Sequence, residues 1–598
     1  MTIFAGIVAR SPSATFPHSA GETLRQLVSR FPGEIVQEFV DDRSHLVKVD
    51  LNVYHSKGVI LDAQGRVSMV AGEPLLIAQD GRCTDLREQD LTALHGALRH
   101  EDWTLLSRCA GTFCAVHYDP VSCSLSLMAD KMGVRPLYYW VGPDFVVFAT
   151  ALRILEGVAQ VLDAMDLQGV TEMASLGYPL GDRTPYVNVK VLREAEVVRI
   201  GSSRVVKHQY WQWDRLPTSG DTQEQAAQLA FEKFGAAVKR RVKADRTVAS
   251  FLSGGLDSRA IVATLRALDV AVHTVNFSAS NTQDYVFGAQ IAAALGTMHQ
   301  QISVDSERAS DPYRKGGVTR WLKSKSVAHA PLEQPGLMWS GDGGSVGVGH
   351  VYLSQAVVGL MRSGKVDEAI DEYLVAEKIG IPEKIFSPRM ADVIGGFLKN
   401  GIRAELERLH CEDPGRSFHL FLMFNDQRRH LAEHFENIDL DRIEFQLPFF
   451  DSEFLESILT LPLDVCLEHK FYMAWLERFA PIVTAVPWQA YPGHVPCPIA
   501  SPGILAYQWS RSKKSDARTR LRQSVVNYAR QIRHAEQVPF ALFNLPRLCA
   551  AGLLSYFGIR DYTYMFKVTS VFCRYWNVCG GRVSALQTAF KKTLVQRA

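Results

Sequence analysis

FLSGGLDSRAIVATL, residues 251–265, places paired glycines, two serines and an aspartate where an apolar strand-like segment runs into a helix-like one. A glycine-rich turn at a helix N-terminus lets backbone N–H groups approach an anion closely, and the helix dipole favours negative charge there. We therefore expect a phosphate group to bind at this turn; a plain strand-to-helix connection is the alternative. The residues that would take part are Ser253, Gly254, Gly255 and Ser258, with Asp257 as a ligand for a divalent cation.

The turn fits neither of two common phosphate-binding motifs. It lacks the lysine of the GxxxxGK[ST] loop and the spacing of the GxGxxG loop. Two serines and an aspartate that bracket paired glycines still favour a phosphate site over an accidental turn. The sequence therefore predicts phosphate binding through a different motif, SGGxDS.

Composition and charge exclude several classes of protein. The 598 residues are 47% hydrophobic, which is typical of globular chains and enough for about two to four domains. Lys and Arg number 65 against 63 Asp and Glu, so the net charge gives no reason to expect nucleic acid or an anionic membrane as the main partner. The ten cysteines are scattered without metal-site spacing, and we expect reduced thiols in a cytoplasmic protein. The apolar stretch 548–559 is shorter than the roughly 20 residues of a membrane-spanning helix.

The pattern of apolar residues changes along the chain. Up to about residue 210, short strand-like runs are broken by Gly, Pro and Asp, which predicts an antiparallel, sheet-rich domain. A helix capped by Ser219 or Asp221 then begins a region in which strand-like and helix-like segments alternate, as in a parallel sheet covered by helices. A helical tail with a basic cluster at 511–522 follows. We expect domains at 1–212 and 220–500, and a helical extension at 501–598.

Four segments resemble the asparagine synthetase family. SGGLDS is similar to the pyrophosphate-binding loop of the adenylating N-type ATP pyrophosphatases. VNFSASNTQDYVFG resembles the segment that lies against adenosine, and WSGDGGSVGVG resembles the SGEGSDELFGG motif. EFQLPFFDSEFLESILTLPLD resembles the E-x-R-x-P-F-L-D stretch of the same family.

The resemblance extends into the first domain and covers about 500 residues. AGTFCAVHYD, LMADKMGVRPLYYW and FATALRIL are similar to segments of an N-terminal-nucleophile (Ntn) glutaminase domain. The resemblance therefore implies an α/β protein: an Ntn-hydrolase-like antiparallel β-sandwich domain, then a parallel-sheet ATP pyrophosphatase domain, with a helical C-terminal extension.

The resemblance also implies a reaction and its site residues. ATP, with Mg²⁺ held by Asp257, would adenylate a carboxylate substrate, pyrophosphate would leave, and ammonia or an amine would displace AMP to give an amide. Lys470, eight residues past the Leu-Pro of the last stretch, matches the lysine that neutralises phosphate charge, and Asp342 matches an acidic motif position. Nucleotide-binding positions would be Leu252, Ser253, Gly254, Gly255, Asp257, Ser258, Val275, Phe277 and Gly341. A homodimer is a further expectation, with no nucleic acid and no membrane span.

Departures from the family pattern leave the substrates open. Thr2 stands where the family's glutaminases carry the nucleophilic cysteine, so we expect the first domain to act as a scaffold. Ser345 replaces a motif aspartate, and Gln446 replaces an arginine. Three hypotheses remain: amidation with ammonia, a cyclase or ligase for a peptide or specialised acid, as in β-lactam synthetases and lasso-peptide cyclases, and an ATP-binding pseudoenzyme. The segment VPWQAYPGHVPCP, 486–498, either lines the acceptor entrance or is a plain rigid loop.

Overall fold

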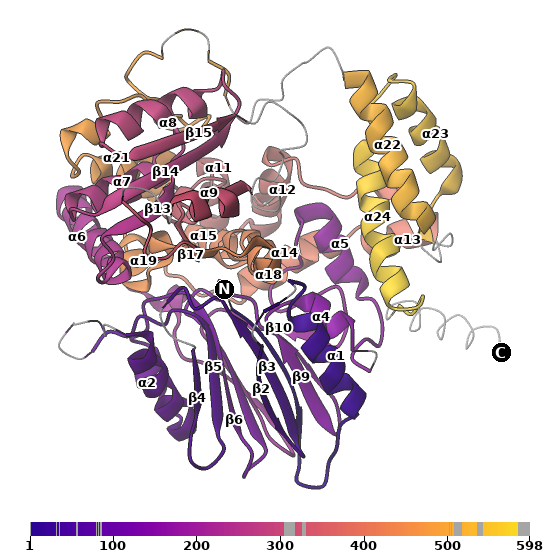
Figure 1. Ribbon diagram of the computed structural model, residues 1–598. Helices are drawn as coiled ribbons and strands as arrows, with labels where there is room; N and C mark the ends of the chain where they lie inside the picture. The colour runs from indigo at the N-terminus through magenta and orange to yellow at the C-terminus, as the bar shows by residue number, and fades with distance from the viewer. Residues whose placement is uncertain are drawn as a thin grey trace.

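The computed structural model describes residues 2–303, 317–325, 330–507, 517–534 and 542–583, apart from short gaps at 32, 35, 55–57, 79–80, 82, 84–85, 159, 502 and 504. Within these residues, two antiparallel sheets form the first part of the chain, a parallel sheet with helices forms the second, and three helices form a lobe at the end (Figure 1). The predicted fold class is confirmed.

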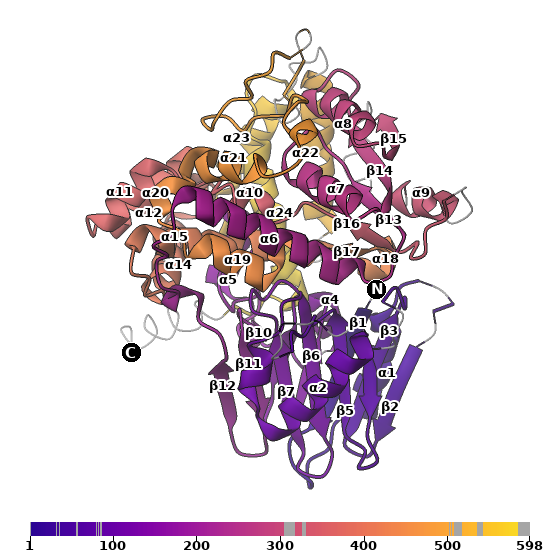
Figure 2. The same ribbon diagram turned by 90° about the vertical axis from the view of Figure 1, so that its left-hand side faces the viewer.

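The first part is a stack of helix, sheet, sheet and helix (Figure 2). One sheet has the order β10-β8-β9-β1-β3-β2 and the other the order β12-β11-β7-β6-β5-β4. Alternating apolar residues bury one face of each sheet against the other, where Phe4, Leu46 and Phe148 meet Met69 and Val116. The strands are β1 (Thr2–Ala9), β2 (Val36–Asp41), β3 (Ser44–Asp50), β4 (Val59–Leu61), β5 (Val67–Gly72), β6 (Phe113–Asp119), β7 (Ser124–Ala129), β8 (Tyr138–Val141), β9 (Phe145–Ala149), β10 (Val189–Val191), β11 (Glu196–Ile200) and β12 (Val205–Gln209).

Helices cover the outer faces of both sheets. Leu24 of α1 packs on the β1 side, and Leu91 and Leu94 of α2 pack on the β5–β6 side, because each helix carries an apolar stripe. The helices of this part are α1 (His18–Val28), α2 (Arg87–His100), α3 (Trp103–Leu106), α4 (Leu152–Glu156) and α5 (Leu167–Leu176).

The second part contains a parallel sheet of order β15-β14-β13-β16-β17. Its strands are β13 (Thr247–Phe251), β14 (Ala271–Ser278), β15 (Met298–Ser303), β16 (Leu337–Trp339) and β17 (Glu444–Gln446). From β13, the chain adds strands first on one side and then on the other, so the strand order reverses between β13 and β16. Ligands of open parallel sheets bind outside the carboxyl ends of the strands at such a reversal. The fold therefore points to the loops after β13 and β16.

Helix α6 (Gln223–Val242) begins one residue later than the predicted caps allow. Its N-cap is Thr222, whose hydroxyl accepts from the N–H of Gln225 while the Gln225 side chain accepts from the N–H of Thr222. The prediction of Ser219 or Asp221 was wrong, because this reciprocal capping box satisfies two helix N-terminal donors at once. Ser219 instead donates to the carboxylate of Asp221 at 2.6 Å.

Most of the remaining elements are helical. The sheet is flanked by α7 (Asp257–Ala267), α8 (Gln283–Ala294) and α9 (Gly317–Lys325). The helices that follow are α10 (Gly344–Gly347), α11 (Gln355–Arg362), α12 (Val366–Ala376), α13 (Pro388–Ile394), α14 (Phe397–Glu407), α15 (Pro414–Leu422), α16 (Arg428–His430), α17 (Ala432–Glu436), α18 (Ile438–Asp441), α19 (Ser452–Leu459), α20 (Leu463–Cys466) and α21 (Lys470–Leu476). The terminal lobe consists of α22 (Ala517–His534), α23 (Leu545–Tyr556) and α24 (Thr563–Val578). Over the described residues, no helix has the length and hydropathy of a membrane span.

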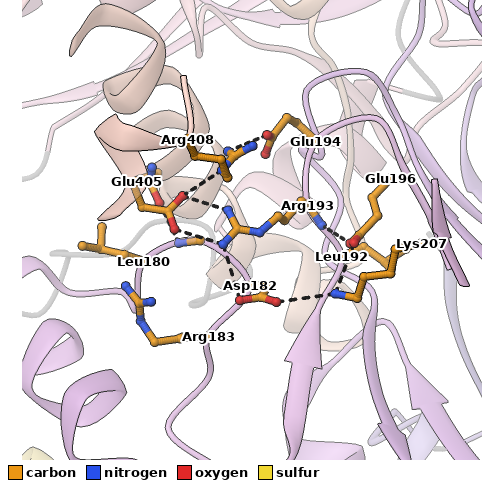
Figure 3. Close-up of polar contacts among 12 residues, drawn as sticks. Leu180, Asp182, Arg183, Leu192, Arg193, Glu194, Glu196, Lys207, Glu405 and Arg408 are labelled. Carbon is orange, nitrogen blue, oxygen red and sulfur yellow. Dashed lines mark hydrogen bonds and ion pairs between the residues drawn. The ribbon is translucent and has the colours of Figure 1, made fainter. Parts of the chain in front are cut away.

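Ion pairs join the first part of the chain to the second. Arg193, between β10 and β11, donates to both carboxylate oxygens of Glu405 in α14 at 2.8 and 3.0 Å, and Arg408 pairs with Glu194 at 2.6 Å (Figure 3). Deeper in the interface, Arg135 donates to Glu444 at 2.6 Å, which helps to hold the pKa of that buried carboxyl at about 2. The two-pronged contact of Arg193 and the buried pair of Arg135 both help to fix the orientation of the two parts.

Candidate functional site

The loops after β13 and β16 touch each other at the carboxyl edge of the parallel sheet. Ser250 of β13 pairs with Trp339 of β16, so the two chains leave the sheet side by side. Gly341 fits here because a Cβ at that position would lie 2.9 Å from Cβ of Asp257 and 3.0 Å from the N–H of Ser258. The contact brings together the two predicted motifs, SGGLDS and WSGDGGSVGVG.

The SGGLDS turn is held by its own hydrogen bonds. The N–H of Gly254 donates to Oδ1 of Asp284 at 2.7 Å, and the N–H of Gly255 donates to the hydroxyl of Ser253 at 3.2 Å. The Ser253 N–H donates to the hydroxyl of Ser258 at 3.0 Å. A Cβ at Gly254 would lie 2.9 Å from Cα of Asp284, so a larger residue would displace the turn from α8. The donors of both glycines therefore have internal acceptors, and an anion would have to use other groups.

The N-terminus of α7 supplies such groups. Its N-cap position is Leu256, and no side chain caps the helix. The first N–H groups of a helix otherwise need an acceptor, and together with the helix dipole they favour an anion. The hydroxyls of Ser253 and Ser258 lie 3.0 Å apart beside this helix end. The arrangement matches the chemistry of a phosphate group at this turn.

Asp257 is the polar centre of the site. Its Oδ1 accepts from the hydroxyl of Tyr472 at 2.6 Å, and its Oδ2 accepts from the hydroxyl of Ser345 at 2.7 Å. Burial raises the pKa of Asp257 to about 6; the nearby Asp342 carboxylate adds to the increase, and the two hydrogen bonds oppose it. Asp342 itself accepts from the Ser340 hydroxyl at 2.5 Å. Two carboxylates that interact electrostatically therefore lie at the SGGLDS turn.

This donor set fits a magnesium ion that is shared with phosphates. Mg²⁺ prefers oxygen ligands, and proteins bind it through one or two carboxylates with substrate phosphates and water. Asp257 and Asp342 supply two carboxylates whose mutual repulsion a cation would relieve. Among the described residues, no group of three or more His, Cys, Asp or Glu side chains has metal-site geometry. Two carboxylates are the protein share of ligands typical of Mg²⁺ bound together with substrate phosphates.

Lys470 lies at the first position of α21, on the helix that brings Tyr472 to Asp257. Its side chain is 47% exposed, and its Nζ lies 3.0 Å from the carboxylate of Glu468. Glu468 and His469 both have left-handed backbone, with φ of 58° and 65°, which turns the chain sharply into the helix. The structure thus brings α21 to the SGGLDS turn, and it pairs Lys470 with Glu468.

The predicted nucleoside strand lies beside the turn. The N–H of Leu252 donates to the carbonyl of Val275 at 3.0 Å, and both side chains are buried in the core. Phe277, two residues further along β14, is partly buried. The polar anchor of this strand is Asn276, whose amide donates to the carbonyl of Leu252 at 3.0 Å and to Asp284 at 3.3 Å.

The segment 486–498 is tied to the turn at several points. Arg259 of α7 donates to the carbonyls of Val486 at 2.8 Å and Pro487 at 2.7 Å. The N–H of Gln489 donates to the carbonyl of Gly254 at 3.0 Å, and the N–H of Val495 donates to that of Glu468 at 3.0 Å. The loop therefore borders both the SGGLDS turn and the residues before Lys470.

Three residues of this region were not predicted: Tyr472, Arg259 and, as an acceptor for Gly254, Asp284. The signal for Arg259 was its position directly after the SGGLDS motif. Tyr472 and Asp284 act across 215 and 30 residues of sequence. A motif search alone does not connect such distant positions.

Comparison with known proteins finds matches to two family models. Residues 231–317 match the asparagine synthase family model, and residues 91–211 match the glutamine amidotransferase domain model. Parts of the chain are thus similar to the asparagine synthetase family. Similar curated proteins include asparagine synthetase [glutamine-hydrolyzing] 3 of Bacillus subtilis, 26% identical over 26% of this chain, and putative asparagine synthetase [glutamine-hydrolyzing] 2 of Methanocaldococcus jannaschii, 28% identical over 23%. Amidase chyE of Penicillium rubens is 27% identical over 27% of the chain.

These similarities are partial. The matches span 25%, 27% and 24% of the lengths of the three relatives. The predicted resemblance to the asparagine synthetase family is confirmed, and the SGGLDS turn lies inside the matched synthase segment.

Proposed function

We propose that this protein is an ATP-dependent ligase that adenylates a carboxylate and then forms an amide with ammonia or an amine. The observation that carries the proposal is the end of α7 without a side-chain cap, next to Asp257 at the strand-order reversal of the sheet. Adenylation requires a site that binds phosphate and a cation and that lies next to a crevice for the substrate.

The proposed reaction has two steps. A carboxylate oxygen of the acid attacks the α-phosphorus of ATP, the bond to the β-phosphate oxygen breaks, and pyrophosphate leaves. The nitrogen of the amine then attacks the acyl carbon, AMP departs with the electron pair of the broken C–O bond, and a proton is lost from nitrogen. In the first step, the N–H groups of α7 and the Ser253 and Ser258 hydroxyls would stabilise charge on pyrophosphate.

Asp257 and Asp342 would hold Mg²⁺, which would neutralise the charge of the phosphates. Tyr472 and Ser345 would fix the orientation of the Asp257 carboxylate through their hydrogen bonds. Lys470 would exchange Glu468 for the phosphates once a nucleotide is bound, because a highly charged triphosphate attracts an ammonium more strongly than one exposed carboxylate does.

We propose further that the first domain does not hydrolyse glutamine. Thr2 pairs with Asp50 across β1 and β3, and Asp50 belongs to a buried cluster with Lys48 at 3.1 Å and Arg87 at 3.3 Å. Lys48 also donates to the carbonyl of Gly58 at 2.8 Å. The cations at this end of the sheet are thus engaged by the chain itself, which supports a scaffold role.

Gln446, which stands where the family pattern has an arginine, lies at the contact between the two parts of the chain. This side chain is buried and donates to Glu73 at 2.8 Å, and Glu73 also pairs with Lys243 at 2.7 Å. The position that differs from the family therefore serves the contact between the two parts of the chain. A peptide or specialised acid remains the alternative to aspartate. The loop 486–498 would contact such a substrate.

An adenylation screen tests the proposal. Pools of amino acids, small organic acids and peptides would be incubated with ATP, Mg²⁺ and radiolabelled pyrophosphate, and exchange of label into ATP would be measured. We expect exchange with at least one acid, and none with Gly341→Ala, whose Cβ would collide with Asp257. If ATP binds by calorimetry while no acid supports exchange or AMP release, the protein is a nucleotide-binding module instead. Glutamate formed from glutamine would contradict the scaffold role of the first domain.

A further inference from the structure

The charge of the chain is distributed unevenly. Residues 501–598 contain 16 Lys and Arg against three Asp and Glu, whereas residues 1–500 contain 49 against 60. The net charge of the whole chain is near zero because an acidic segment, 1–500, and a strongly basic one, 501–598, offset each other. Such an asymmetry indicates that the extension meets an anionic partner.

The basic lobe carries an exposed apolar surface, here called the apolar tip, made of Leu553, Tyr556, Phe557, Ile559 and Tyr564. Leu553 is 60% exposed, Phe557 54% and Ile559 70%. The tip joins the C-terminal end of α23 to the start of α24, and the Tyr556 and Phe557 rings lie 5.6 Å apart. Because four of the five residues lie within 553–559, they gather at the C-terminal end of α23 and are not scattered over the surface of the lobe.

Helix α23 explains why this face is exposed. Leu548, Ala551 and Ser555 face inward, whereas Leu545, Cys549 and Leu553 lie outward at intervals of four residues. A helix that is apolar on both sides normally has neighbours on both sides. In Figure 1, α23 lies on the side of the lobe that faces away from the parallel sheet. Its outer face is therefore placed to meet a partner.

Arginines border the tip. Arg522 of α22 donates to the carbonyl of Tyr556 at 3.0 Å and lies 5.4 Å from the centre of its ring. Arg560 lies 5.3 Å from the ring of Tyr562. Asp561, the one acidic residue among 517–534 and 542–583, caps the N–H of Thr563 at 2.9 Å. The apolar tip is thus framed by positive charge.

We propose that the apolar tip docks onto an anionic lipid surface. Aromatic and aliphatic side chains would enter the boundary between headgroups and acyl chains, and the surrounding arginines would bind lipid phosphates. A second copy of this lobe is disfavoured because the two lobes carry the same charge, and a nucleic acid would leave the aliphatic residues Leu553 and Ile559 without a partner. The function of this surface is independent of the ligase chemistry.

Vesicle flotation with the full-length protein tests the proposal. We expect binding to vesicles of phosphatidylcholine mixed with phosphatidylglycerol, weaker binding to phosphatidylcholine alone, and release by salt. Phe557→Ser/Ile559→Ser should lower binding by about tenfold or more because it removes the inserted groups. Arg522→Gln/Arg560→Gln should lower it by about fivefold for each charge.

A matched control is Val121→Ser/Val375→Ser, which removes two side chains of 71% and 75% exposure from other faces. It should bind as the wild type does. The proposal is overturned if the wild type does not bind anionic vesicles, or if Phe557→Ser/Ile559→Ser binds them as well as Val121→Ser/Val375→Ser does. It is also overturned if light scattering shows that Phe557→Ser/Ile559→Ser converts a dimer to a monomer. Thermal unfolding checks that all variants are folded.

Discussion

The hydroxyl of Tyr472 lies 2.6 Å from Oδ1 of Asp257 and donates a hydrogen bond to it. This bond joins the helix of Lys470 to the SGGLDS turn, and it opposes the effect of burial, which raises the pKa of this carboxyl to about 6. Because cation binding needs the carboxylate form, the state of this pair should be visible in the pH dependence of the reaction.

Tyr472→Phe should move the acid limb of the pyrophosphate-exchange rate to higher pH. Removing the donor takes away one of the two bonds that stabilise the Asp257 carboxylate, so we expect a shift of about one pH unit. The measurement is exchange rate against pH at saturating ATP. Val465→Ala, at a partly buried site on α20, serves as the control for a general loss of packing. An unchanged limb would show that Asp257 does not titrate in this range.

Asp257→Asn should abolish exchange and raise the thermal stability of the nucleotide-free protein at pH 7.5. Since the folded pKa is about 6 and the ordinary value is 3.8, the wild type loses stability as pH rises between these values, and the loss is complete above pH 6. The variant avoids this cost, so its Tm should rise by about 2–4 °C at pH 7.5. The gain should disappear near pH 4. If the variant is less stable than the wild type at pH 7.5, burial does not destabilise the charged form of Asp257.

Ser345→Asp should lower the Mg²⁺ concentration needed for half-maximal exchange, by about tenfold. A carboxylate in place of the hydroxyl would add a third anionic oxygen ligand next to Asp257 and Asp342. Without Mg²⁺ the same change should lower Tm, because like charges would face each other. Ser345→Ala is the control and should not improve the Mg²⁺ requirement. No change in the magnesium titration would place the ion elsewhere.

Gly344→Ala should impair the site, whereas Gly359→Ala should not. A Cβ at Gly344 would collide with the carboxylate of Asp257, and the group it would displace is the polar centre of the site. A Cβ at Gly359 in α11 meets nothing within 4 Å, so that variant should gain about 0.5–1 kcal/mol from helix propensity. Exchange rates and Tm of both variants provide the comparison. Equal activity would argue against a tight contact between the two loops.

Lys470→Ala should reduce the exchange rate by about a hundredfold without a measurable change in Tm. The side chain is exposed and its ion pair with Glu468 is exposed too, so it contributes little to stability. Glu468→Gln is the matched control: it releases the lysine and should keep or increase the rate. A Lys470→Ala variant with full turnover would remove this residue from the mechanism.

Local patterns predicted the fold and much of the candidate site. The β13–α7 turn and the parallel sheet were predictable because apolar periodicity and glycine spacing are local properties. Gly341 and Asp342 were predictable from a motif. The motif did not predict that both residues lie near Asp257.

Contacts between distant parts of the chain escaped prediction. Nothing near Tyr472 in sequence indicates that its hydroxyl meets Asp257, and nothing near Asp284 indicates that it accepts from Gly254. The cap at Thr222 was missed for a different reason: Ser219, Asp221 and Thr222 could each cap the helix, and the reciprocal bond with Gln225 decides among them.

The position of Tyr472 has a consequence for biosynthesis. On the ribosome, Asp257 emerges 215 residues before the hydroxyl that orients it, and β17 joins the sheet only after more than a hundred residues beyond β16 have been made. Pairings of such high contact order form slowly and late. A nascent chain that stops short of α21 would therefore display a folded first domain beside an unfinished candidate site.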